Sequence, residues 1–81
     1  MVIALTSAGP SYSLEQARRG VLVVAAAGNN NANLDTSPFY PAADAATEDY
    51  IVAVASTSQT GAKASFSNYG PAVTVLAPGV L

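Results

Sequence analysis

Four apolar runs, separated by polar and turn-forming stretches, dominate the hydrophobic pattern of this chain. They occupy residues 2–5, 21–27, 50–56 and 72–79. Each run has the length of a strand rather than of a helix. The second run is apolar at every position, and this pattern is typical of a strand that is covered on both faces of a parallel sheet. The pattern therefore predicts four main strands.

One helix is expected between the first two strands. In the segment SYSLEQARRG, Ser13 and Gln16 have the spacing of a capping box, and Gly20 is suited to end the helix. Residues 7–20 are long enough for a crossover between parallel strands. A helix of about two turns needs to pack on a sheet to be stable. We therefore expect an α/β fold, a partial parallel sheet of about four strands with one short crossover helix.

The remaining segments are expected to be loops. Residues 30–49 form a long polar stretch that contains the aromatic pair Phe39 and Tyr40, and a loop of that length in a compact domain is usually functional or disordered. Residues 57–71 are rich in small and turn-forming residues. Within them, 62–66 has the composition of a brief additional strand.

Composition and charge exclude several classes of protein. The chain has 81 residues, of which 51% are hydrophobic, and this size allows one domain at most. Its net charge of −2 comes from three cations and five carboxylates, so we expect no nucleic-acid partner. No apolar run approaches the roughly 20 residues that span a bilayer. The first residues lack the cationic leader of a signal peptide, and we expect neither a membrane partner nor a signal peptide.

The second apolar run stops at Gly28, which is followed by three asparagines. If this run is a central parallel strand, Gly28 and Asn29 follow its carboxyl end, where open α/β sheets place their ligands. Gly28 would let the chain turn sharply, and Asn29 would offer an amide donor that does not titrate. Asparagine also favours simple turns, so from these residues alone both interpretations stay open.

Five segments in order resemble the subtilisin-like serine proteases, the subtilases. They are GVLVVAAAGN at 20–29, YPA at 40–42, IVAVAS at 51–56, ASFSNYGP at 64–71 and VLAPGV at 75–80. The resemblance implies that residues 1–81 are an internal fragment of a subtilase catalytic domain, which has three layers in this family. The fragment would hold the oxyanion-hole and specificity-pocket region.

The resemblance also implies roles for individual residues. Asn29 matches the side-chain donor of the oxyanion hole, which stabilises the tetrahedral intermediate. One wall of the primary specificity pocket matches Ser7, Ala8 and Gly9, and the opposite wall matches Ala26, Ala27 and Gly28.

A third part of the pocket is implied around the aromatic pair. Tyr40 and Pro41 match a dipeptide near the pocket floor that commonly carries a cis bond in subtilases. Phe39 precedes it, and a large residue there would shorten the pocket.

The catalytic relay of the family has no match in these residues. The sequence contains no histidine, so the Ser-His-Asp relay of the family cannot be assembled from it. Asp35 in LDTSP follows Asn29, whereas the family aspartate precedes it, and we interpret Asp35 as a turn residue. Asp44, Glu48 and Asp49 could hold the calcium that subtilases often bind, but a solvated acidic loop is the preferred interpretation. We assign no metal ligand and no cofactor.

Two functions remain as hypotheses. The first is part of a secreted or extracellular serine endopeptidase, inactive alone, whose partners are a peptide or protein substrate and the remainder of the catalytic domain. The second is a small non-catalytic α/β binding or interaction module. A nucleotide-binding version of the second lacks support, because no glycine-rich phosphate motif follows the early strands.

Overall fold

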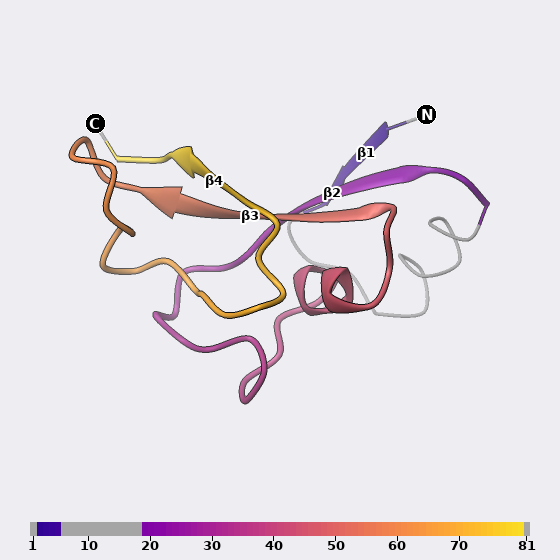
Figure 1. The fold of residues 1–81 in the computed structure, drawn as a ribbon, viewed down its shortest axis with the longest axis horizontal. Helices are drawn as coiled ribbons and strands as arrows, with labels where there is room; N and C mark the ends of the chain where they lie inside the picture. The colour runs from indigo at the N-terminus through magenta and orange to yellow at the C-terminus, as the bar shows by residue number, and fades with distance from the viewer. Residues whose placement is uncertain (1, 6–18, 81) are drawn as a thin grey trace.

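A single parallel sheet organises the chain in the computed structural model, which describes residues 2–5 and 19–80 (Figure 1). The strands are β1 (Val2–Leu5), β2 (Leu22–Ala26), β3 (Ile51–Thr57) and β4 (Val75–Pro78), in the order β1-β2-β3-β4. All neighbouring pairs are parallel. The α/β class and the four predicted strands are therefore confirmed.

The fourth strand begins later than the hydrophobic pattern predicts. Expected from residue 72, it starts at Val75. The backbone N–H of Val73 donates to the carbonyl of Gly70 at 3.1 Å. Because the chain is still turning at this point, it cannot yet pair with β3.

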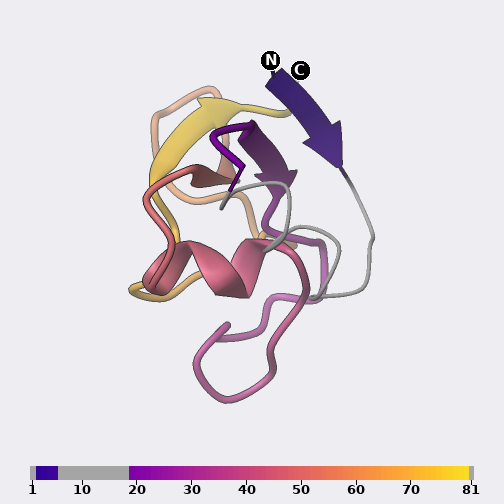
Figure 2. The same ribbon diagram turned by 90° about the vertical axis from the view of Figure 1, so that its right-hand side faces the viewer.

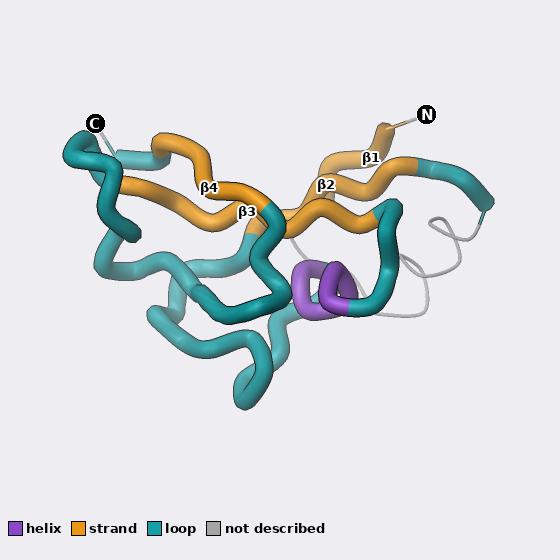
Figure 3. The backbone as a smooth tube through the Cα atoms, in the orientation of Figure 1, coloured by secondary structure: helices purple, strands orange, loops and turns teal. Residues whose placement is uncertain are grey.

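The connections after β2 and after β3 pass along the same face of the sheet, below the strands in Figure 3. The first connection contains the 3₁₀ helix η1 (Ala42–Ala46), which lies against β3 (Figure 2). The expectation of a loop throughout 30–49 is therefore wrong at η1. The N–H of Ala43 donates to the carbonyl of Phe39 at 2.9 Å, and that of Asp44 donates to Pro41 at 3.0 Å. The alanines let this turn pack closely on the sheet.

Two further expectations have different outcomes. The predicted crossover helix falls largely in residues 6–18, outside the described residues, and stays a prediction. The brief strand expected at 62–66 is wrong, because a single antiparallel bridge joins Thr57 to Lys63. The chain reverses tightly just before it, with the N–H of Ser58 donating to Ala62 at 2.8 Å. This reversal leaves no extended run that could form a ladder.

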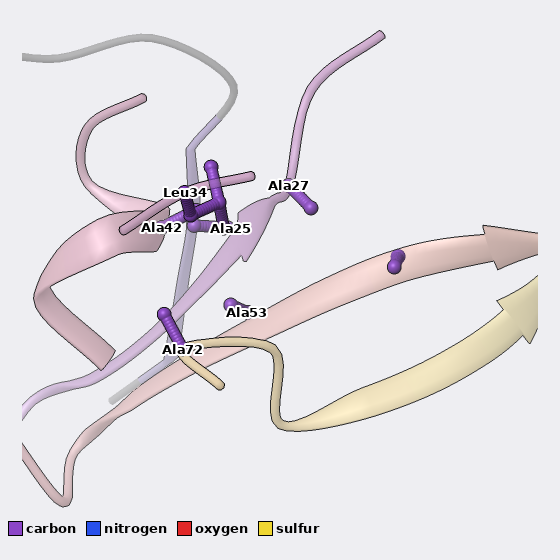
Figure 4. Close-up of a cluster of buried hydrophobic side chains, with 7 residues drawn as sticks. Ala25, Ala27, Leu34, Ala42, Ala53 and Ala72 are labelled. Atoms are coloured by element: carbon purple, nitrogen blue, oxygen red, sulfur yellow. The ribbon is translucent and has the colours of Figure 1, made fainter. Parts of the chain in front are cut away.

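The core under the sheet is built mainly from alanine. Burial alternates along β2 and β3, so that Ala25 and Ala53 face the core. They join a cluster whose other buried members are Ala27, Leu34, Ala42, Ala55 and Ala72 (Figure 4). Small side chains here allow the backbone of the connections to approach the strands closely.

The opposite face of the sheet is less covered. Val24 and Val54 are half-buried there, and Ala26 is exposed. The uninterrupted apolar run was interpreted as a strand covered on both faces. In this structure, one face of β2 is buried and the other is partly open.

Candidate active site

The site begins where β2 ends. The N–H of Ala27 donates to the carbonyl of Val54 at 2.9 Å and continues the sheet by one residue. Gly28 then takes a φ of +104°, a conformation that side chains rarely adopt. A Cβ atom at Gly28 would also collide with Nδ2 of Asn68 and lie 3.1 Å from Cδ2 of Phe39. Glycine is therefore required both by the turn and by its neighbours.

A buried asparagine holds the chain on both sides of this turn. Asn68 is 1% exposed, and its Nδ2 donates to the carbonyl of Ala27 at 2.8 Å. Its Oδ1 accepts the N–H of Asn30 at 3.0 Å and that of Ala32 at 2.9 Å. The backbone N–H of Asn68 donates to the carbonyl of Gly28 at 2.9 Å. Four hydrogen bonds of one residue therefore fix the segment 27–32.

The same two segments are joined further along by backbone hydrogen bonds. The N–H of Asn31 donates to the carbonyl of Phe66 at 2.9 Å, and the N–H of Tyr69 donates to Ala32 at 3.0 Å. Leu34 donates to the carbonyl of Tyr69 at 2.8 Å. The chain after β2 thus lies beside the ASFSNYGP segment, which is more than thirty residues away in sequence.

The three consecutive asparagines differ in their environments. The Oδ1 of Asn31 accepts a hydrogen bond from Nζ of Lys63 at 3.0 Å, and Nζ also donates to the carbonyls of Ala64 and Ser67. Asn30 is tied through its backbone to Asn68. Asn29 is exposed, and its side chain makes no hydrogen bond with any residue of 2–5 or 19–80. Of the three, Asn29 has an amide that is uncommitted within the described structure.

The predicted wall and the predicted oxyanion donor meet at one open cavity of about 370 Å³. Its lining includes the four predicted residues Ala26, Ala27, Gly28 and Asn29. It also includes Ser56 and Phe66, together with the 77–79 segment after β4, which the sequence analysis did not single out. The register of β3 and β4 beside β2 brings them there, and no pattern within a single segment could have indicated it.

The aromatic pair lies on the core side of the turn. The Tyr40–Pro41 peptide bond is cis, as the resemblance implies. Phe39 is half-buried, packs against the alanine cluster and lies next to Gly28. Tyr40 is 38% exposed. The predicted residues Ser7, Ala8 and Gly9 lie outside the described residues, so the opposite wall of the pocket stays a prediction.

Comparison with known sequences decides the family. The sequence model of the Subtilase family matches residues 4–81. The chain belongs to the subtilase family. This membership excludes the alternative of an α/β module with no peptidase ancestry.

Similar proteins and structures agree with this membership. The subtilase chain is 46% identical to Subtilisin BL of Lederbergia lenta over 83 residues, which cover 96% of the chain and 28% of that relative. It is 38% identical to Subtilisin-like protease 5 of Arthroderma otae over 74 residues, covering 90% of the chain and 17% of the relative. A crystal structure of a cold adapted subtilisin-like serine proteinase aligns with a TM-score of 0.78 and 30% identity. That alignment covers 96% of the chain and 29% of the solved structure.

The acidic segment of this subtilase does not fit a metal centre. Asp44 lies in η1, and Glu48 and Asp49 follow it. Within 2–5 and 19–80, no three acidic or other metal-ligating side chains lie close enough together to hold an ion. The calcium that the resemblance raises therefore has no carboxylate cluster in this segment. Among the same residues, no helix is sufficiently long and apolar to cross a bilayer.

Proposed function

We propose that this subtilase chain supplies the oxyanion-hole asparagine and one wall of the substrate pocket to a serine endopeptidase. The observation that carries the proposal is the exposed amide of Asn29, which has no hydrogen bond in the described structure and lines a cavity at the end of β2. The strand ends there because Gly28 turns the chain. Membership of the subtilase family supports this assignment.

The chemistry suits an amide. When a nucleophile attacks a peptide carbonyl, negative charge develops on its oxygen, and a fixed neutral donor stabilises this state more than the ground state. The sequence has no histidine to act as the general base. We therefore assign the nucleophile, the base and its orienting carboxylate to other parts of the complete enzyme, and we expect this chain to be inactive alone.

The proposed substrate is a peptide or protein that lies along the edge of the sheet. Ala26, Ala27 and Gly28 would form one wall of the pocket for the substrate side chain, because their small size leaves space beside the strand. The segment 7–9 would form the opposite wall, and Phe39 would limit the depth. Secretion of the complete protein, which the resemblance implies, belongs to the same proposal.

Replacement of Asn29 in the complete enzyme tests this function. Asn29→Ala should lower kcat by about 10² to 10³ with little change in KM. This range is the loss seen when the corresponding donor is removed from subtilisin itself, the system that supplies the general figure. Asn30→Ala is the matched control, because only the backbone of Asn30 is engaged. Equal and mild effects of both substitutions would show that Asn29 is simply part of a turn.

A further inference from the structure

We propose that Asn68 is a positioning residue for the oxyanion donor. Its buried carboxamide fixes the course of the chain from Ala27 to Ala32 and thereby the direction in which Asn29 points. This inference rests on the proposed role of Asn29. Asn68 itself touches neither substrate nor reacting atoms, so its effect on the reaction passes through Asn29.

The contacts of Asn68 lie on both sides of the donor. Nδ2 binds the carbonyl of Ala27, two residues before Asn29. Oδ1 binds the N–H groups of Asn30 and Ala32, which follow it. The side chain of Asn29 has no hydrogen bond with the described residues. Its position therefore depends on the backbone that carries it, and the amide of Asn68 holds this backbone at each end.

The position of Asn68 is fixed in turn by the sheet. The Oγ of Ser67 accepts the N–H of Ser56 in β3 at 3.0 Å and donates to the carbonyl of Asn68 at 3.0 Å. The N–H of Asn68 donates to Gly28. A continuous set of hydrogen bonds thus runs from the central strand β3 through Ser67 and Asn68 to the turn. The donor is thereby held relative to a rigid element rather than to a loose loop.

A carboxamide is well matched to these partners. It offers a donor for the carbonyl of Ala27 and an acceptor with two lone pairs for the two N–H groups. Aspartate would keep the acceptors but lose the donor, and alanine would lose both. Because Asn68 is 1% exposed, water cannot readily replace the missing partners. Either substitution should let the turn move.

Movement of the turn should affect the chemical step more than substrate binding. An oxyanion donor acts when it lies about 2.7–3.1 Å from the developing charge. A displacement of roughly 1 Å can cost up to about 10² in rate. Loss of Asn68 should therefore lower kcat with little effect on KM, and by no more than the loss of Asn29 itself.

A double-mutant cycle in the complete enzyme tests the inference. Asn68→Ala should lower kcat by about 10- to 100-fold when Asn29 is present. In the Asn29→Ala background, it should lower kcat by no more than about threefold, because there is no donor left to position. Asn68→Asp, which keeps both acceptor bonds, provides a second variant with a smaller loss of thermal stability. All rates are measured below the melting temperature and per folded enzyme.

Thr74→Val is the matched control for loss of a side-chain hydrogen bond to the backbone. Thr74 Oγ1 accepts the N–H of Ala53 in β3 at 3.0 Å and lies away from the turn. This variant should lower the melting temperature while kcat stays within about twofold of the parent. Hydrogen exchange gives a readout independent of activity: the N–H groups of Asn30 and Ala32 should exchange faster in Asn68→Ala but not in Asn29→Ala.

Three results would overturn the inference. One is the same fold-loss from Asn68→Ala with and without Asn29, and another is a lower melting temperature with unchanged kcat. The third is unchanged exchange at Asn30 and Ala32. If Asn29→Ala alone left kcat unchanged, the proposed function itself would fail. The positioning role would then fail with it, even where faster exchange still showed that Asn68 holds the turn.

Discussion

The ring of Phe39 lies against Gly28, close enough that a Cβ atom on the glycine would stand 3.1 Å from Cδ2 of the ring. If Gly28 forms a wall of the substrate pocket, Phe39 limits the space beside it. Phe39→Gly in the complete enzyme should shift kcat/KM in favour of substrates with a large side chain at the cleaved position. A change of about tenfold in the ratio is expected, comparable to the effect of one or two methylene groups.

The measurement compares kcat/KM for two matched peptides that carry alanine or phenylalanine before the cleaved bond. Tyr50→Ala is a suitable control, because Tyr50 is 53% exposed and precedes the opposite end of β3. An unchanged ratio for Phe39→Gly would place Phe39 outside the pocket.

Gly28 itself should tolerate no side chain. Gly28→Ala adds a Cβ at a φ of +104° and against both Asn68 and Phe39. We expect a loss of about 1–3 kcal/mol in the free energy of unfolding. Gly61→Ala is the matched control, because Gly61 has a φ of +87° but no atom within 4 Å of an added Cβ. Chemical unfolding of the complete enzyme measures both, and equal losses would show that the contacts around Gly28 are irrelevant.

The isolated 81-residue chain should hydrolyse no peptide. Without histidine it lacks the base of the serine-protease relay, and an oxyanion donor alone leaves only residual catalysis. A chromogenic peptide assay with purified chain checks this expectation. A serine-directed phosphonylating reagent should also leave the chain unlabelled. Turnover that scales with chain concentration and survives repurification would contradict it.

The isolated chain should also be poorly stable as a monomer. Val75 in β4 is 47% exposed and Leu76 is 56% exposed, and the sheet face of Val24 and Val54 is only half-buried. Parallel sheets are normally covered on both faces. We expect self-association or a broad thermal transition, measured by analytical ultracentrifugation and circular dichroism. A sharp two-state melt from a monodisperse monomer would contradict this.

The sequence was most informative where local pattern and structure coincide. The apolar runs predicted the strands because buried parallel strands require apolar residues at successive positions, and Gly28 marked the end of β2. The importance of Asn29 came from the family resemblance, since a run of asparagines after a strand is also compatible with a turn.

Long-range contacts could not be predicted in the same way. Asn68 binds the carbonyl of Ala27 across 41 residues of sequence, and nothing within ASFSNYGP indicates this partner. The 3₁₀ helix η1 was missed because the carboxylates near it favour a solvated loop. Its alanines are selected by close packing on β3, which is visible only once the sheet is formed.

The inhibition constant of a peptide aldehyde measures the proposed hydrogen bond of Asn29 most directly. Attack by the enzyme's nucleophile converts the aldehyde carbonyl into a tetrahedral hemiacetal, whose oxygen occupies the oxyanion site. Asn29→Ala in the complete enzyme should raise this inhibition constant about as much as it lowers kcat/KM, roughly 10²-fold. The dissociation constant of the product peptide should stay unchanged, and Asn30→Ala should alter neither. An unchanged aldehyde constant, or equal weakening of aldehyde and product, would contradict the assignment of Asn29 as the oxyanion donor.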